Sequence, residues 1–182
     1  MKKLPYKRIV IIGTSGSGKT TLGAEIESRF GVPHIELDAL HWEPDWKEAD
    51  DEVMRMRVQA AVEADTWMLD GNYAVARDLS WARAELLIWL DYPLLVNFWR
   101  LLKRTLRRAI THEEIWNGNH EPVLMQLKLW SDDSIFHWLF KTYWRRKREY
   151  PVLLALPDYA HLEVLHFTSP KETAAWLDSF AA

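Results

Sequence analysis

The stretch Gly13-Thr14-Ser15-Gly16-Ser17-Gly18-Lys19-Thr20 fits the pattern G-x-x-x-x-G-K-[ST], and its surroundings fit as well. Residues 8–12 before it form an apolar run typical of a buried strand, and residues 20–30 after it place apolar side chains at helical spacing. The alternative is a Gly/Ser turn between a strand and a helix that binds no ligand. Because pattern, position and flanking elements agree, we favour a phosphate-binding loop (P-loop).

The chemistry of this loop follows from its residue types. Glycines allow backbone conformations that a β-carbon forbids, so successive N–H groups point inward and surround phosphate oxygens. The N-terminus of the following helix adds unpaired N–H donors and the positive end of its dipole. We expect Lys19 to reach the β- and γ-phosphates of ATP and the Thr20 hydroxyl to bind Mg²⁺, with Thr21 as a weaker phosphate contact. The expected nucleotide-binding residues of the loop are Gly13, Ser15, Gly16, Ser17, Gly18, Lys19, Thr20 and Thr21.

Length and composition restrict the remaining choices. The 182 residues suit a single domain over 1–182, and the absence of cysteine excludes a disulfide framework, a Cys-based zinc site and thiol catalysis. With no signal-peptide pattern and no apolar run of about 20 residues, we expect a cytoplasmic monomer or homodimer without a membrane partner. The net charge of −3 gives no global attraction to nucleic acid, although residues 100–108 and 141–148 are strongly basic and 36–63 are acidic.

Four further strands are expected over residues 33–37, 66–69, 86–90 and 161–165. Helices are expected over 49–64, 93–109 and 134–155, the last of these with an interruption near Pro151, and a final helix opens at Ser169-Pro170. Residues 40–46 are expected as an aromatic loop. Strands that alternate with helices predict an α/β fold with a parallel sheet covered on both faces.

Carboxylates follow three of these strands, where parallel sheets bind their ligands. Asp70 ends an apolar strand and is expected to hold Mg²⁺ through its water shell; the alternative is a turn aspartate in Asp-Gly. Asp38 is expected to accept or orient the proton of an attacking hydroxyl; the alternative is an Asx turn or a helix cap. Glu36 ranks lower, and Asp91 is expected to cap the next helix.

Arginines supply the cations that phosphoryl transfer needs on its equatorial oxygens. Arg100, Arg104, Arg107 and Arg108 are spaced by three and four, so most of them share one helical stripe. Arg104 is the favoured catalytic member, against the alternative of a solvated face, and Arg145 and Arg146 are expected to meet the same phosphates. Trp42, Trp46 and Tyr73 are candidates to stack on a planar substrate, with plain packing as the alternative.

The segments G-T-S-G-S-G-K-T-T, L-D-A-L-H-W, W-M-L-D-G-N-Y, L-L-I-W-L-D-Y-P and W-R-R-K-R-E-Y-P together resemble the adenylate-kinase-like family of DNA topology modulation proteins, over nearly the whole chain. The resemblance implies a nucleoside monophosphate kinase-like, three-layer P-loop NTPase fold with strand order 2-3-1-4-5. It also implies an acceptor-binding helical segment over 38–65 and a helical lid over 109–143. Arg100 is implied to stack on the adenine, Arg104 to contact phosphates, Arg145 and Arg146 to follow the lid, and residues 167–171 to pass the adenine.

Two departures from adenylate kinases bear on the acceptor. The arginine of their G-D-x-L-R pattern is absent from Leu37-Asp38-Ala39-Leu40-His41, and their D-G-F-P-R is replaced by Asp70-Gly71-Asn72-Tyr73-Ala74. Arg55, Arg57 and Arg77 are candidates to substitute. The sequence therefore predicts a kinase that transfers the γ-phosphate of Mg²⁺-ATP to a small molecule, with nucleoside monophosphates among the candidates. The alternatives are an ATP-dependent regulatory or DNA-associated NTPase, with nucleic acid as the less favoured partner, and a plain NTPase.

Overall fold

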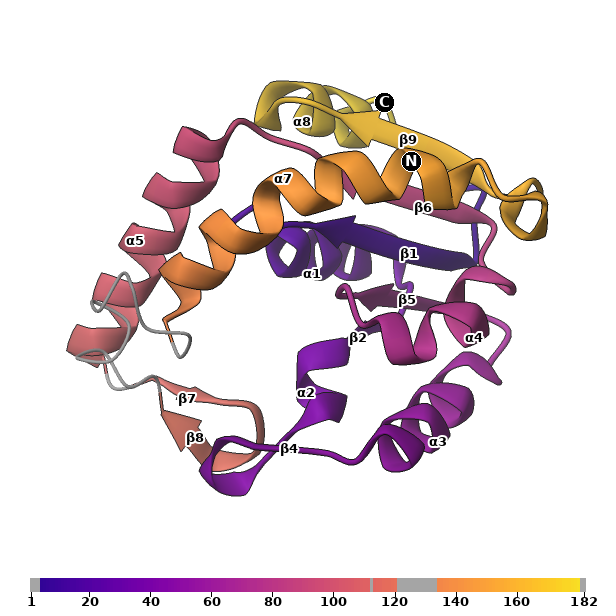
Figure 1. Cartoon of the computed structure of the whole chain (residues 1–182). Helices are drawn as coiled ribbons and strands as arrows, with labels where there is room; N and C mark the ends of the chain where they lie inside the picture. The colour runs from indigo at the N-terminus through magenta and orange to yellow at the C-terminus, as the bar shows by residue number, and fades with distance from the viewer. Residues whose placement is uncertain (1–3, 112, 121–133, 181–182) are drawn as a thin grey trace.

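A five-stranded parallel sheet forms the centre of the computed structural model, which describes residues 4–111, 113–120 and 134–180 (Figure 1). The strand order β2-β5-β1-β6-β9 is the expected 2-3-1-4-5 order in chain numbering. Each neighbouring pair of strands is parallel. The five strands are β1 (Arg8–Gly13), β2 (His34–Glu36), β5 (Trp67–Asp70), β6 (Leu86–Leu90) and β9 (Glu163–Phe167).

Helices cover both faces of the sheet because β1 turns alternate apolar side chains to opposite sides. Ile9 and Ile11 belong to a core with α1 and α8, whereas Val10 and Ile12 belong to a second core with α3, α4 and α7. These two cores make the fold a three-layer α/β structure, as expected. The helices are α1 (Lys19–Phe30), α3 (Asp51–Val62), α4 (Arg77–Trp81), α5 (Leu94–Thr111), α7 (Ile135–Leu154) and α8 (Pro170–Asp178), with short 3-10 turns η2 (Ala74–Ala76) and η4 (Pro157–Tyr159).

The segment expected as an aromatic loop over 40–46 instead forms regular secondary structure. A short helix α2 (Leu37–His41) leads into a hairpin made of β3 (Trp42–Glu43), the turn η1 (Pro44–Trp46) and β4 (Lys47–Glu48). Asp38 therefore lies in the first turn of α2 and not at the end of a strand. The turn depends on two residues with left-handed backbone, Asp45 at φ 63° and Trp46 at φ 55°, which single-sequence patterns do not reveal.

Other boundaries differ by small shifts. The last strand begins at Glu163, two residues later than expected, because Leu86–Leu90 pairs in register with Glu163–Phe167. The helix α3 is shorter than 49–64 at both ends, and α5 extends beyond 109 to Thr111. The expected interruption near Pro151 is wrong, since α7 runs through this residue to Leu154.

The segment expected as a lid, 109–143, contains the end of α5, a second small hairpin and the start of α7. This hairpin consists of β7 (Glu114–Ile115), η3 (Trp116–Gly118) and β8 (Asn119–His120). The part of the expected lid over 121–133 lies outside the described residues.

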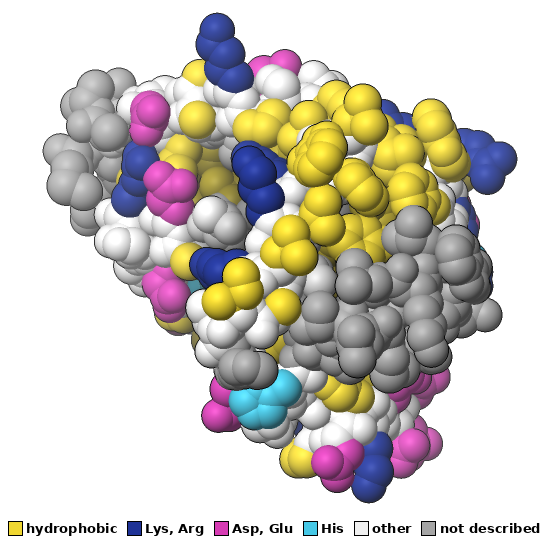
Figure 2. Space-filling model, turned by 90° about the vertical axis from the view of Figure 1, so that its left-hand side faces the viewer, with side chains coloured by type: hydrophobic (Ala, Val, Ile, Leu, Met, Phe, Trp, Pro, Cys, Tyr) yellow, Lys and Arg dark blue, Asp and Glu magenta, His cyan; other side chains and the backbone are white. Residues whose placement is uncertain are grey.

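The outer face of α5 carries exposed apolar side chains, and Figure 2 shows hydrophobic side chains gathered on this side of the molecule. On its inner side α5 packs against α7 through a small core around Leu101, Phe136 and Leu139. No helix in the described part of the chain is long and apolar enough to cross a bilayer. The exposed apolar residues of α5 are Leu95, Trp99, Leu106 and Ile110.

Candidate active site

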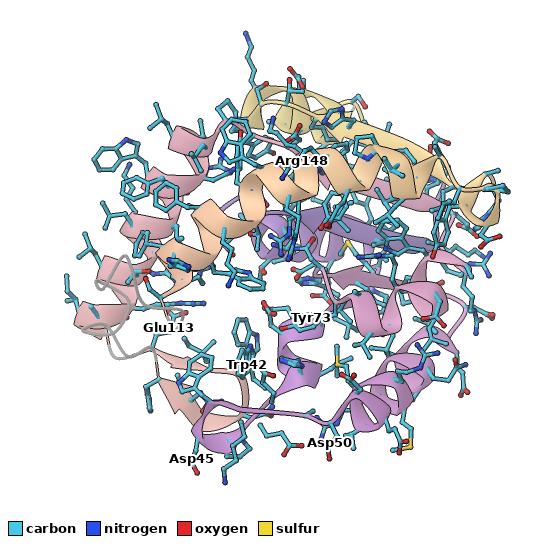
Figure 3. The ribbon with its side chains drawn as sticks, viewed as in Figure 1. Trp42, Asp45, Asp50, Tyr73, Glu113 and Arg148 are labelled. Atoms are coloured by element: carbon cyan, nitrogen blue, oxygen red, sulfur yellow. The ribbon has the colours of Figure 1, made fainter. Side chains whose placement is uncertain are left out.

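A large cleft opens at the carboxyl edge of the sheet, where parallel sheets place their ligands. The P-loop forms its floor, α5 and α7 form one wall, and α2 with the two hairpins forms the other. Its volume of about 2230 Å³ exceeds the roughly 300–1,000 Å³ of a single small-molecule pocket. In Figure 3, Trp42 and Tyr73 point from their elements toward this central space. The cleft therefore has room for a nucleotide and a second substrate together.

The P-loop has the geometry expected of an anion cradle. Gly16 and Gly18 have φ of +80° and +92°, and a Cβ on Gly16 would lie 2.3 Å from the backbone oxygen of Asn97. Helix α1 follows Gly18 without a side-chain cap, so its first N–H groups stay available to a ligand. The hydroxyl Oγ of Ser17 is buried and has no partner among the described residues. These features fit the phosphate groups of a nucleotide.

Lys19 lies at the bottom of the cleft beside two carboxylates. Burial lowers the pKa of its ammonium, while the negative charges of Asp70 and Asp38 oppose that shift. The positive charges of Arg146 and Arg104 lower the pKa of Lys19 further. The Lys19 ammonium donates to the carbonyl of Thr14 (3.5 Å), the same residue whose hydroxyl accepts from Arg146. Of the other expected loop residues, Ser15 to Gly18 with Thr20 and Thr21 line the same cleft, whereas Gly13 does not.

The side chain of Asn72 forms hydrogen bonds with the P-loop backbone and with α7, a role that the sequence did not reveal. Its Nδ2 donates to the carbonyl of Gly13 (2.7 Å), and its Oδ1 accepts from the Gly13 N–H (3.1 Å). The hydroxyl of Tyr150 on α7 donates to the same Oδ1 (2.9 Å). One side chain thus connects the start of the P-loop, the end of β5 and α7.

Asp70 is buried at the end of β5, with 1% of its surface exposed. Its Oδ2 lies 2.9 Å from Nε2 of His34, a neighbour that the sequence analysis did not single out. Burial lowers the pKa of His34, but the hydrogen bond to Asp70 and its charge outweigh burial, and the net shift is upward. No group of three His, Asp or Glu side chains suited to a metal occurs among residues 4–111, 113–120 and 134–180. A Mg²⁺ ion here would therefore depend on phosphate oxygens and water, as Mg²⁺ commonly does.

Asp38 faces the cleft and is held in place by Tyr73, whose hydroxyl donates to its Oδ1 at 2.5 Å. Burial and the charge of Asp38 raise the pKa of Tyr73, so its hydroxyl stays a donor. Glu36 also lines the cleft and accepts a hydrogen bond at Oε2 from Nε1 of Trp116 (3.0 Å). Burial, with the charge of Asp70 added, raises the pKa of Glu36. The structure thus brings Asp38 and Lys19 into one cleft, as the sequence predicts.

The expected arginines do not all occupy equivalent positions. Arg146 is buried at 9% exposure and donates to Oγ1 of Thr14 in the P-loop (3.3 Å), and burial lowers its pKa. Arg104 lines the cleft from α5. Arg100 also lines the cleft, donates to the carbonyl of Ser17 (3.1 Å) in the P-loop and lies over the ring of Tyr92. Its stacking on an adenine stays a prediction.

Arg145 also lines the cleft, but its guanidinium lies over the ring of Trp138, 5.8 Å from the centroid, and its Nε is 3.7 Å from Glu149. Two of the candidate substitute arginines are engaged elsewhere. Arg55 pairs with Asp78 (2.8 Å), and Arg57 pairs with Glu43 (2.8 Å). Neither lines the cleft, so they do not replace the acceptor-binding arginines of adenylate kinases. Arg77 does line it, with its guanidinium over the ring of Trp81.

The two hairpins, residues 42–48 and 114–120, interlock and together form the wall opposite α5. Asn119 accepts at Oδ1 from the Trp46 N–H (2.9 Å) and donates from Nδ2 to the carbonyls of Glu43 and Trp116 (both 2.9 Å). Nε1 of Trp46 donates to the His120 carbonyl (2.9 Å), and Asn117 donates to the carbonyl of Trp42 (2.5 Å). These hydrogen bonds between the hairpins join residues more than 70 positions apart in the chain, so no local sequence pattern reveals them.

Comparison with known proteins agrees with this architecture. No family model and no curated protein matches the sequence. The chain has the fold of the P-loop NTPases. A gluconokinase from Sinorhizobium meliloti resembles it with a TM-score of 0.52 and 19% identity, over 99% of this chain and 95% of that chain.

Two shikimate kinases give similar values. The enzyme from Bacteroides thetaiotaomicron has a TM-score of 0.55 and 16% identity, over 97% of this chain and 98% of that chain. The enzyme from Acinetobacter baumannii, solved in complex with shikimate, has a TM-score of 0.57 and 15% identity, over 97% and 94%. At such identities the likeness concerns the fold, so membership of the DNA topology modulation family stays a prediction.

Proposed function

We propose that this chain is a kinase that transfers the γ-phosphate of Mg²⁺-ATP to a hydroxyl group of a small molecule. The observation that carries the proposal is the shared position of Lys19 and Asp38: the ammonium side chain of the P-loop and a carboxylate on α2 line the same cleft. One group suits the donor phosphates and the other suits the attacking hydroxyl. The fold neighbours, which are kinases by name, support this assignment.

Each residue has a defined task in this proposal. The P-loop amides and Lys19 bind the phosphates of ATP. Thr20 would hold Mg²⁺ directly and Asp70 would hold it through water, and the ion would supply charge neutralisation between the β- and γ-phosphates. Arg104 and Arg146 stabilise the charge on the transferring group, with Arg145 as a further candidate.

Asp38 supplies the remaining group, the one that handles the proton of the acceptor. The acceptor oxygen forms a bond to the γ-phosphorus while the bond to the β–γ bridging oxygen breaks, which yields ADP and a phosphate monoester. The hydroxyl proton passes to Asp38, which Tyr73 holds in position. The two hairpins, joined through the hydrogen bonds of Trp46 to Asn119 and His120, line this half of the cleft.

The test is ADP release from Mg²⁺-ATP in the presence of a panel of hydroxyl acceptors. Lys19→Ala is expected to lower the transfer rate by about 10²-fold or more, the size of effect seen when one charge-stabilising donor is lost. Lys47→Ala is the control, because Lys47 is exposed and does not line the cleft. Circular dichroism verifies that both variants are folded. Full activity of folded Lys19→Ala would refute the role of Lys19, and ADP release that no acceptor increases would indicate a plain NTPase. The fold neighbours lend no support to the DNA-associated alternative.

A further inference from the structure

The two walls of the cleft carry opposite charge. The wall formed by α5 and α7 presents several arginines, including Arg104 and Arg146, toward the P-loop. The opposite wall comes from residues 36–48 and 113–120, all of which the structure describes. From these two segments Glu36, Asp38, Glu48, Glu113 and Glu114 line the cleft, and no Lys or Arg does. Glu113 is paired with Arg107 of α5 (2.9 Å), so the other four carboxylates give this wall its net negative charge. The wall formed by α5 and α7 is therefore basic, and the wall formed by residues 36–48 and 113–120 is acidic; Arg77 lines the cleft from outside these two segments.

The carboxylates of the acidic wall accept hydrogen bonds and carry negative charge. Asp38 and Glu36 each have one oxygen bonded to a neighbouring donor, Tyr73 and Trp116 respectively. A carboxylate has about four lone-pair sites, so each keeps capacity for a ligand. A ligand that donates hydrogen bonds suits these groups, whereas a phosphate or carboxylate on the ligand would meet like charge at short range.

Indole rings make up the rest of this wall. Trp42, Trp46 and Trp116 line the cleft and contact one another edge to face, with centroids 5.4 Å apart for Trp42–Trp46 and 6.4 Å for Trp46–Trp116. The ring of His41 lies beside them, tilted by 43° against the ring of Tyr73 with the two centroids 4.5 Å apart. Such rings offer flat apolar faces next to polar edges, a surface suited to a ligand with a carbon face and hydroxyl edges.

We propose that the phosphoryl acceptor is an uncharged, hydroxyl-rich small molecule of the sugar, sugar-alcohol or nucleoside class. One hydroxyl of this molecule donates to Asp38 and attacks the γ-phosphate, and a second donates to Glu36. The carbon face of the molecule packs on the indoles of Trp42 and Trp116. This inference rests on the proposed kinase function and specifies the chemical class of the acceptor. It favours neutral compounds over nucleoside monophosphates, which carry negative charge.

The experiment compares acceptors that share a skeleton and differ in charge. The pairs are glucitol against gluconate and adenosine against AMP, with glucosamine as a cationic analogue of glucose. The expected result is that at least one neutral compound is phosphorylated with a kcat/KM about tenfold or more above that of its anionic partner. An anionic member that equals or exceeds its neutral partner, or glucosamine above glucose, would overturn the inference while leaving the kinase assignment intact. ATP bound with no phosphorylation of any compound would instead contradict the proposed function, and the inference with it.

A binding measurement tests the role of the acidic wall, residues 36–48 and 113–120, in acceptor binding independently of catalysis. Titrating the full chain, loaded with Mg²⁺ and a non-hydrolysable ATP analogue, with the same neutral compounds is expected to change tryptophan fluorescence. Trp116→Ala is expected to weaken this binding about tenfold or more and to leave binding of the ATP analogue within about twofold. Trp99→Ala is the matched control, because Trp99 is exposed on α5 and does not line the cleft. Equal acceptor binding by both variants would remove Trp116 from the site.

Discussion

Substitution of Asn119 tests how the two hairpins of the acidic wall are held together. Its side chain is buried, at 3% exposure, and two of its three hydrogen bonds cross from the 114–120 hairpin to the 42–48 hairpin, at Trp46 and Glu43. A hydrogen bond contributes about 1 kcal/mol net, so losing these two bonds in Asn119→Ala is expected to weaken the association of the two hairpins by about 2 kcal/mol. That loss corresponds to about a 30-fold shift toward the undocked arrangement, since about 1.4 kcal/mol is tenfold in an equilibrium constant.

Native-state hydrogen exchange at the Trp46 amide measures this shift, because that N–H donates to Asn119. In Asn119→Ala it is expected to exchange up to about 30-fold faster, while amides of the buried strand β1 change little. His120→Ala is the control, since its side chain is exposed and only its backbone carbonyl accepts from Trp46. Unchanged protection of the Trp46 amide in folded Asn119→Ala would refute the view that Asn119 fastens the two hairpins.

Two further predictions concern the P-loop and the first strand. Gly16→Ala is expected to destabilise the fold by about 2 kcal/mol or more and to weaken ATP binding in calorimetry, because φ is +80° and the new Cβ would lie 2.3 Å from the Asn97 carbonyl oxygen; wild-type affinity and stability would contradict this. Glu85→Gln tests pH dependence. Partial burial raises the pKa of Glu85, but hydrogen bonds from the Lys7 N–H and the Arg8 side chain outweigh it, and the net shift is downward. Its contribution is therefore present above the unfolded-state pKa and is lost as pH falls through the folded-state value. Chemical unfolding should show the variant less stable by about 0.5–1 kcal/mol near pH 7, with the difference shrinking as the pH falls below the unfolded-state pKa of Glu85. A difference that does not change with pH would contradict the assignment.

Much of the fold follows from local sequence. The apolar runs of β1 and β6 are buried on both faces, which is why they read as continuous hydrophobic segments. The positions of Gly16 and Lys19 follow from a motif whose strand, loop and helix are contiguous in the chain. Asp38 and Lys19 could be placed together because both follow strands of a parallel sheet. Rules of local pattern and connection were sufficient for these features.

The details that the sequence did not reveal depend on distant contacts. His34 lies beside Asp70 because β2 and β5 are paired in register, and a lone histidine in a short strand gives no sign of such a partner. Asn72 forms hydrogen bonds with the backbone of Gly13, 59 positions away, which no local pattern indicates. Arg55 and Arg57 were candidates to substitute for the arginines of adenylate kinases, but they pair with Asp78 and Glu43. Side-chain pairing of this kind is decided by tertiary packing.

The backbone conformation of Trp46 in the acidic wall determines where its indole ring lies in the cleft. A bulky residue at φ 55° costs roughly 1–2 kcal/mol, and the two hydrogen bonds that Trp46 makes to Asn119 and His120 offset that cost. Both partners lie on the segment that follows α5, the helix that also carries Arg104. The conformation that sets the Trp46 indole in the cleft is therefore stabilised only when that segment is docked. It follows that acceptor binding and the position of the segment after α5 are coupled, since any ligand that packs on these indoles favours the docked arrangement.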